Sequence, residues 1–396
     1  MGPETLEGEE MAVEAEVMHA AMAEAVRSLT AVNVPAMDLE RCQDALEAGA
    51  GPNDPLIINT IKKVFLEADA DLVQMTMERV RSGLPDRANV VASAAAAFSG
   101  SCALLALYDP VQHVLRVANT GDSRAVLGRW DGEKYIAYAM SVDQTGFNEE
   151  EVARITQQHP GEDVVDPKTG RVHGLAVTRA FGDARWKWPQ EVSKRAYEMF
   201  WGPSPRPDSM IKTPPYLTAE PEVTEVVVQT GDHPDFLVMA SDGLWDNMSS
   251  DDAVTCVQMW LDKNKPAAFM EKHNAGTLGP IGPARRTPNL LPPSLPGNLA
   301  PVYSTAAEVA GEDEDVYFDE EEKCLRWRVS PKHFVVEDVH CGIHLIKNAL
   351  GGKRRDLFTG VMSVQPPLSR RVRDDITVQV IFFGVDNNLA LAGRSG

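Results

Sequence analysis

The sequence predicts an α+β protein in which short antiparallel strands follow an N-terminal stretch of helix. Apolar residues recur at helical spacing over residues 59–80, where Ile61, Phe65 and Leu72 fall on one side. From residue 101 the pattern changes to short runs of β-forming residues, which are separated by turns such as Asp131-Gly132. Strands joined by so few residues pair antiparallel, so this region is expected to form a meander.

Later in the chain, strands alternate with helices. The first β region should hold four strands, at residues 102–108, 113–118, 124–129 and 134–140. Further strands are expected at 223–229, 236–240 and 376–383, and further helices at 9–32, 249–261 and 336–350. Asn148 with Glu151 resembles a capping box that opens another helix. Residues 161–216 are rich in Gly, Pro, Trp and Arg, which predicts a long irregular surface excursion.

Composition limits the classes of protein that this chain can belong to. It has 396 residues, 43% of them hydrophobic, and a formal net charge of −20. The acidic balance argues against nucleic-acid backbones as partners, because those require a dense Lys and Arg surface. No apolar run approaches the roughly 20 residues that a membrane span needs. Five cysteines without C-x-x-C spacing favour reduced thiols in an intracellular protein over disulfides or a zinc site.

Two segments are expected to lie apart from the folded core. Residues 1–50 predict an N-terminal helical segment, ahead of one domain at 51–396. Within that domain, residues from about 265 to 330 are crowded with Pro and Gly and then become almost continuously acidic over 312–322. Such a composition cannot bury enough apolar surface to fold, so we expect an insertion there that ends in a solvated acidic loop.

Acidic turns at the ends of three β-runs are the strongest chemical signal. Asp122 lies beyond the run at 113–118, Asp242 and Asp246 follow the run at 236–240, and Asp374 precedes the last strand. Carboxylates held on strand ends suit a hard divalent cation when several converge. For any single turn a structural role is favoured, because Asp-Gly and Gly-Asp are common turn formers. Their combination predicts a Mg²⁺ or Mn²⁺ site.

Five motifs, in order, resemble the PPM family of type 2C metal-dependent protein phosphatases. They are Gly-Ser-Cys-Ala at 100–103, Asn-Thr-Gly-Asp-Ser-Arg-Ala-Val at 119–126, Leu-Ala-Val-Thr-Arg-Ala-Phe-Gly-Asp at 175–183, Ser-Asp-Gly-Leu-Trp-Asp at 241–246 and Arg-Asp-Asp-Ile-Thr-Val at 373–378. The chain further resembles the fungal mitochondrial pyruvate dehydrogenase phosphatases, through Ser-Val-Asp-Gln-Thr-Gly at 141–146, His-Pro-Gly-Glu at 159–162, Lys-Thr-Pro-Pro-Tyr-Leu-Thr-Ala-Glu-Pro at 212–221 and Asn-Ala-Leu-Gly-Gly at 348–352.

The resemblance implies a fold, a reaction and a set of ligands. The fold would be a four-layer α-β-β-α sandwich of two antiparallel sheets. The reaction would be hydrolysis of phosphoserine or phosphothreonine by a water that two metal ions activate and orient, with no catalytic residue beyond the metal ligands. Asp242 and Asp374 match ligands of this Mg²⁺ or Mn²⁺ pair. Asp122 and Asp246, with Asp242 shared, match ligands of a third ion.

One departure from the family keeps a second hypothesis open. The sequence has no Asp-Gly-His-Gly turn, whose Asp bridges the two ions in the family, and no match to the upstream Arg that grips the phosphate. The first strands are therefore expected to be missing, which would expose apolar sheet surface and leave the exact chain weak or inactive. The alternative to an active phosphatase is a catalytically dead relative, or a truncated product, that acts as a binding module.

Arginines and tryptophans in the irregular excursion carry two interpretations each. Arg171, Arg179 and Arg185 lie where the family places a flap beside the active site and could contact an acidic or phosphorylated substrate; Arg179 is the candidate substrate-binding residue. An ion pair between Arg179 and Asp183, or another nearby acid, is an equally good explanation. Trp186 and Trp188, with Trp201, either pack this flap or meet a partner protein.

Two further patterns favour structural roles. His340 and His344 have zinc-binding spacing but no third ligand, which favours surface or satisfied histidines. The run Gly351-Gly-Lys-Arg-Arg355 follows a helix instead of preceding one, so it predicts a helix stop and not a phosphate loop.

Partners and compartment follow from the resemblance alone. A phosphorylated protein substrate is implied, with the E1 alpha subunit of pyruvate dehydrogenase as the candidate, in the mitochondrial matrix. Residues 1–10 are acidic, unlike an Arg-rich transit peptide, so the chain carries no visible address label and a cytoplasmic location is the alternative.

Overall fold

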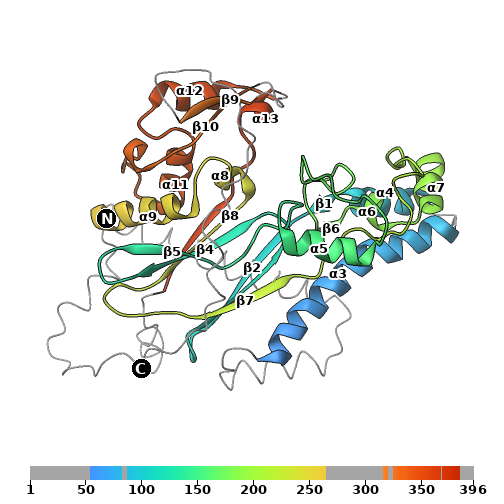
Figure 1. Ribbon diagram of the computed structural model, residues 1–396, viewed down its shortest axis with the longest axis horizontal. Coiled ribbons are helices and arrows are strands. Elements are labelled where there is room, and N and C mark those ends of the chain that lie inside the picture. The colour runs from blue at the N-terminus through green and yellow to red at the C-terminus, as the bar shows by residue number, and fades with distance from the viewer. Residues whose placement is uncertain (1–53, 83–86, 265–314, 320–323, 367, 384–396) are drawn as a thin grey trace, which may run out of the picture. The chain divides into compact units, whose positions relative to one another are not determined.

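A computed structural model describes residues 54–82, 87–264, 315–319, 324–366 and 368–383 (Figure 1). The chain folds into two compact units, and neither is continuous in sequence. The first unit joins residues up to Ala103 with Gln144–Glu222, and the second joins Leu104–Asp143 with residues from Val223 onward. The predicted N-terminal helical segment, 1–50, lies outside the described residues, as does most of the predicted insertion.

The second unit holds two sheets. The larger has the strand order β11-β8-β4-β5, with every pair antiparallel, and the smaller has the order β2-β3-β7. The strands are β2 (Ala103–Asp109), β3 (Val114–Thr120), β4 (Arg124–Trp130), β5 (Tyr135–Ala139), β7 (Glu222–Val227), β8 (Phe236–Ala240) and β11 (Val378–Phe382). Four residues join β2 to β3, a connection too short for a parallel crossover. The predicted α+β class with two antiparallel sheets is confirmed.

The first four strands do not form one meander, which corrects the prediction. β2 and β3 pair in the smaller sheet, whereas β4 and β5 pair in the larger one. The chain changes sheet at Gly121, whose φ of 113° lies in the region that glycine favours. The turn between β3 and β4 therefore lies at the strand ends of both sheets, where it joins an inner strand of one to an inner strand of the other.

Alternating side chains build the core between these sheets. One face of β3 contributes Leu115 and Val117, and the facing positions of the larger sheet contribute Leu127, Leu237 and Met239. Because strand side chains alternate between faces, the other face of the larger sheet is free to bury Val126, Phe236 and Val238 elsewhere.

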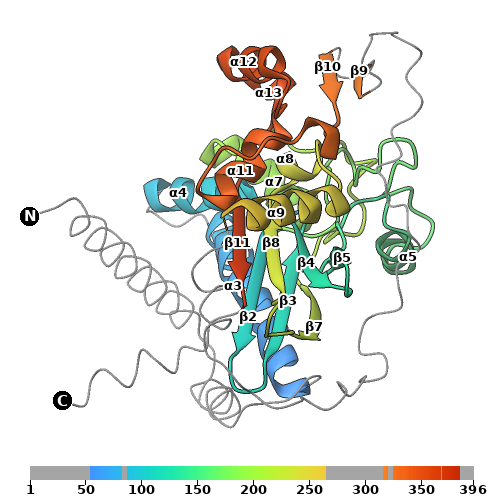
Figure 2. The ribbon, with the colours of Figure 1, turned by 90° about the vertical axis from the view of Figure 1, so that its left-hand side faces the viewer.

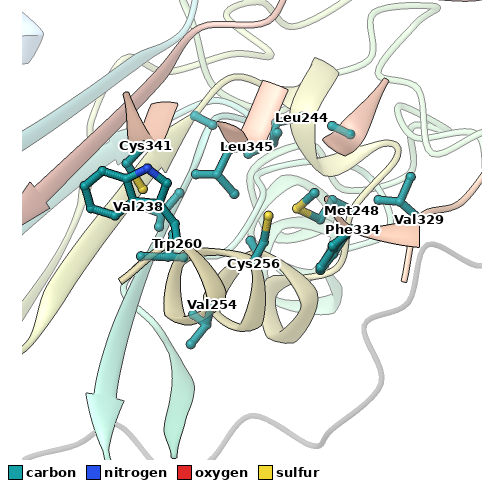
Figure 3. Close-up of a cluster of buried hydrophobic side chains, with 14 of the residues drawn as sticks. Val238, Leu244, Met248, Val254, Cys256, Trp260, Val329, Phe334, Cys341 and Leu345 are labelled. Atoms are coloured by element: carbon teal, nitrogen blue, oxygen red, sulfur yellow. The ribbon is translucent and has the colours of Figure 1, made fainter. Parts of the chain in front are cut away.

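Two helices cover that other face. Figure 2 shows α9 (Ser250–Asn264) and α11 (Cys341–Ala349) lying across the larger sheet. Cys256 of α9, Leu345 of α11 and Val238 of β8 meet in one buried cluster (Figure 3). The second unit thus has three layers, one helical and two of sheet. A helical layer outside the smaller sheet stays a prediction.

The helix predicted at 336–350 begins later than expected, and two short strands lie in the described part of the predicted insertion. α11 begins at Cys341, so Val336 and Val339 lie ahead of it, and Gly351 and Gly352 take positive φ after its end, as a helix stop requires. β9 (Val316–Asp319) pairs antiparallel with β10 (Cys324–Trp327). Residues 316–319 of the acidic stretch therefore form a strand, and Trp327 of β10 is 2% exposed and donates its indole N–H to the Ala349 carbonyl. The insertion as a whole stays a prediction. The remaining short elements are α8 (Asp242–Trp245), η2 (Pro331–His333), α12 (Arg355–Ser363) and α13 (Ser369–Val372).

The first unit has a helical core of its own. α3 (Pro55–Ser82) confirms the predicted helix at 59–80 and packs with α4 (Arg87–Phe98) and α7 (Gln190–Phe200). Their shared cluster includes Val73, Val90 and Phe200 around the buried Trp188.

Residues 161–216 are less irregular than predicted. They hold α7, the short α6 (Ala184–Lys187) and β6 (Phe181–Gly182), which pairs with β1 (Gly100–Ser101). A second buried cluster joins Ile155 of α5 (Glu149–Gln158) to Trp186 and Tyr216. The lack of sequence periodicity hid this core because loop residues build much of it.

Three outer strands each carry an exposed apolar side chain. Leu105 on β2, Val227 on β7 and Ile381 on β11 are 39%, 41% and 36% exposed. Within the described part of the chain, no helix is long and apolar enough to cross a membrane.

Candidate metal centre

The end of β8 positions the first predicted ligands. All five residues of β8 are buried, and the chain then turns into α8 at Asp242. The indole N–H of Trp245 donates to the Ala240 carbonyl at 3.0 Å, which fixes the turn that carries Asp242 and Asp246. Asp242 therefore stands directly beyond a rigid central strand.

A hydroxyl clamp holds the Asp374 turn beside the Asp242 turn. Ser241 Oγ donates to the Asp375 carbonyl and accepts from the Thr377 N–H, both at 3.0 Å. Gly243 lies so close that a Cβ there would be 2.6 Å from the same Asp375 oxygen. The clamp and the glycine explain why Asp242 and Asp374, which are 132 positions apart in sequence, are neighbours.

Asp122 enters from the turn between β3 and β4. The Asn119 side chain donates to the Gly121 carbonyl at 3.1 Å and holds that turn. Arg124, two residues on, forms an ion pair with Asp143 at 2.5 Å and lies over the ring of Trp245 at 5.1 Å. One arginine thus ties the segments around Asp122, Asp143 and α8 together.

Charge repulsion shows that these carboxylates share one neighbourhood. Burial, followed by the charges of Asp122, Asp246 and Asp374, raises the pKa of Asp242 to about 7. The pKa of Asp246 is raised to about 6, by burial first and then by Asp374 and Asp122, against a lowering effect of Arg326. Asp246 is exposed to solvent, so water screens its charge interactions more than those of Asp242, which is half-buried.

All four predicted acids gather here, and the sequence analysis missed a fifth. Asp143 also raises the pKa of Asp246. It follows β5 within a few residues, so the rule that selected the other acids, a carboxylate just beyond a strand, would have found it.

The acids suit a hard cation in chemistry but do not close around one. Carboxylate oxygens are the ligands that Mg²⁺ and Mn²⁺ prefer. Within the residues described, however, no three His, Cys, Asp or Glu side chains come close enough together to hold an ion. Asp374 is also ion-paired with Arg370 at 3.2 Å. The donor atoms therefore fit such a cation in chemical type, but the described side chains do not surround one position.

Arg179 lies in the first unit and is committed to acidic partners. It is 7% exposed and forms ion pairs with Glu151 at 2.5 Å and Glu222 at 2.8 Å. It also donates to the Glu220 carbonyl at 2.9 Å. The geometry favours the structural alternative over substrate contact, although the partner is Glu151 and not Asp183.

The predicted histidine roles agree with the structure. His344 is fully buried, where its Nε2 lies 3.0 Å from the Cys256 carbonyl and its Nδ1 lies 3.1 Å from Asn348 Nδ2. His340 caps α11 by accepting from the Ile343 N–H. These contacts leave the pair no role in binding zinc.

Comparison with known proteins places the chain in a family. Residues 45–275 match the family model described as protein phosphatase 2C. The chain belongs to the protein phosphatase 2C family. This is the family that the five sequence motifs indicated.

Three relatives show how similar this phosphatase 2C chain is to known proteins and how much of each relative it covers. It is 36% identical to a protein phosphatase 2C homolog of Schizosaccharomyces pombe, over 88% of this chain and 68% of the relative. It is 36% identical to the mitochondrial pyruvate dehydrogenase (acetyl-transferring) phosphatase 1 of Saccharomyces cerevisiae, over 84% of this chain and 54% of the relative. The Bos taurus phosphatase of the same name is 32% identical over 72% of this chain and 48% of its own length. The chain spans about half the length of the two pyruvate dehydrogenase phosphatases.

Proposed function

We propose that this chain is the metal-dependent core of a protein phosphatase that hydrolyses phosphoserine and phosphothreonine. One observation supports it above the others. Four carboxylates, from three turns that are far apart in sequence, repel one another at one end of the second unit. Acidic groups are kept this close in a folded protein where a bound cation offsets their repulsion.

Each acid has a role in this proposal. Asp242 and Asp374 would hold a pair of Mg²⁺ or Mn²⁺ ions, and Asp122 and Asp246, with Asp242 shared, would hold a third. When bound, such ions supply a water of lowered pKa and neutralise charge on a phosphoryl group. The chain itself supplies the rigid frame: β8 fixes Asp242, the Ser241 clamp fixes the Asp374 turn, and Arg124 holds Asp143 in place.

The substrate and compartment are proposed from the relatives. Two of them are named as mitochondrial phosphatases of pyruvate dehydrogenase, which makes a phosphorylated E1 alpha subunit in the mitochondrial matrix the candidate substrate. A phosphoprotein of the cytoplasm is the alternative. The net charge of −20 supports a protein substrate over a nucleic acid in either compartment.

A second candidate function is binding without turnover. Two observations favour it: the printed sequence lacks an Asp-Gly-His-Gly turn, and the described acids do not close around an ion. A phosphatase-like chain that cannot assemble its metal pair would still present the surfaces that meet a phosphoprotein.

Metal-dependent hydrolysis separates the two candidates. We would measure Mn²⁺-stimulated release of phosphate from p-nitrophenyl phosphate and from a phosphoserine peptide, for the wild type, Asp242→Ala and Asp251→Ala. Asp251 is exposed at the start of α9 in the same unit, so its variant controls for loss of one negative charge. Activity that requires Mn²⁺ and is lost only in Asp242→Ala supports the phosphatase. No activity in a folded preparation supports the binding module.

A further inference from the structure

Two arginines of the first unit lie against one tryptophan. The guanidinium carbon of Arg206 is 4.7 Å from the ring centroid of Trp186, and that of Arg185 is 5.6 Å from the same centroid. The charge of Arg185 acts on Arg206: burial first, and then this like charge, lower the pKa of Arg206. Bringing two positive charges together costs free energy unless an anion lies between them.

Among the residues that the structure describes, no acid compensates this pair. Arg179, Arg154 and Arg124 all have carboxylate partners, and the chain has 58 acidic residues to supply more. Within the described part of the chain, the hydrogen bond of Arg185 goes to a backbone oxygen, that of Ser204 at 2.6 Å. The Nε atoms of Arg185 and Arg206 are both buried without a described acceptor. An unpaired buried donor carries a desolvation cost, so the described chain leaves these two guanidinium groups incompletely satisfied.

The surrounding chain fixes Trp186 and the backbone of Arg206, which support the two guanidinium groups. Trp186 is 6% exposed, and its indole N–H donates to the Val172 carbonyl at 3.0 Å. The Trp186 carbonyl accepts from the Tyr216 N–H, and the Gln190 side chain donates to the Arg206 carbonyl. A support that holds two arginines in place lowers the entropy cost of binding a ligand between them.

The neighbouring loop adds polar capacity on the same side. A Cβ on Gly174 would lie 3.2 Å from Arg206 Nη1, so this loop passes directly beside the guanidinium. His173, the residue before Gly174, is 8% exposed, and its Nε2 is buried without a described hydrogen-bond partner. Arginine pairs with free fork donors recognise phosphoryl oxygens through charge-assisted hydrogen bonds.

We propose that Arg185 and Arg206, supported by Trp186, form a binding subsite for a phosphoryl group, separate from the carboxylate cluster of the second unit. A phosphorylated segment of the protein substrate is the occupant that this predicts, and that part rests on the proposed function. Free phosphate carries the same chemistry and is the other source.

A binding assay without catalysis tests the subsite. The full chain carrying Asp242→Asn is kept in EDTA, and a labelled peptide with one phosphoserine is titrated by fluorescence anisotropy beside its unphosphorylated twin. Arg185→Gln and Arg206→Gln are compared with Arg81→Gln, an exposed arginine of the same unit that pairs with Glu191. Arg206→Lys keeps the charge but removes the planar fork, and thermal melts confirm that each variant is folded.

The expected result is that each Gln variant weakens phosphopeptide binding about tenfold and Arg206→Lys weakens it less, while Arg81→Gln stays within about twofold of the parent. Competition by inorganic phosphate as strong as that by the peptide keeps the subsite and assigns it to free phosphate. Equal binding of both peptides, or equal losses in all Gln variants, overturns the subsite. Because the assay needs no turnover, binding without Mn²⁺-dependent hydrolysis counts against the proposed function alone, and hydrolysis without this binding counts against the subsite alone.

Discussion

Replacing Glu151 by Gln should destabilise the first unit, because this buried glutamate joins α5 to the segment around Arg179. Glu151 is 1% exposed, and its oxygens accept from Arg179, Arg154 and the Thr178 hydroxyl. Burial acts to raise its pKa, but the hydrogen bonds from Arg179, Arg154 and Thr178 outweigh burial and lower it from 4.5 to about 2.

That pKa shift sets the magnitude and the pH window. Lowering the pKa from 4.5 to about 2 corresponds to about 3 kcal/mol of preference for the ionised form in the folded state. Because the folded-state pKa is the lower one, this stabilisation is fully present above about pH 4.5 and is lost as the pH falls through about 2. At pH 7 the free energy of unfolding of the Gln variant should therefore be about 3 kcal/mol lower, since the variant leaves the buried positive charge of Arg179 poorly compensated.

Urea unfolding followed by circular dichroism at pH 7 and again near pH 2.5 is the measurement. Glu150→Gln, an exposed glutamate in the same helical turn, is the matched control and should cost less than about 1 kcal/mol. The gap between wild type and Glu151→Gln should narrow at the lower pH. A Glu151→Gln variant no less stable than Glu150→Gln at pH 7 would refute the argument.

Three further predictions concern the two units. Gly182→Ala should destabilise the first unit by at least about 2 kcal/mol in urea unfolding, since Gly182 has a φ of +67° and an added Cβ would lie 1.9 Å from the Ser99 oxygen; an unchanged midpoint would show that this backbone is not required. Leu345→Ala should cost about 2–5 kcal/mol, because Leu345 is fully buried between α11 and the larger sheet, whereas Ile343→Ala, at 45% exposure, should cost far less; equal losses would contradict the packing. In EDTA the melting temperature should fall as the pH rises from about 5 to 8, because the pKa of Asp242 is raised from 3.8 to about 7 and the stability of its protonated form is lost on ionisation. Asp242→Asn should flatten this pH dependence, and an Asp242→Asn profile identical to that of the wild type would contradict the prediction.

Local signals predicted most of the secondary structure, and their failures have physical causes. β8 and α3 were found because their apolar periods are strong and their boundaries carry turn or cap residues. The N-cap of Asn148 forms as expected, but Glu151 does not return to close a capping box, because Arg179 takes its carboxylate. The pairing of β9 with β10 was missed because the acidic residues around β9 hide its apolar pattern, whereas Trp327 of β10 is buried only in the folded chain.

The sequence by itself determined the family, the α+β class and the identity of the acidic residues at the strand ends. Those properties depend on short segments, because turn preferences and the alternation of apolar and polar residues act between residues close in the chain. Only the tertiary structure decided that the chain changes sheet after β3, that Arg179 belongs to Glu151, and that Arg185 and Arg206 share Trp186. Such pairings depend on which distant segments meet, and charge and burial act through space once the chain has folded.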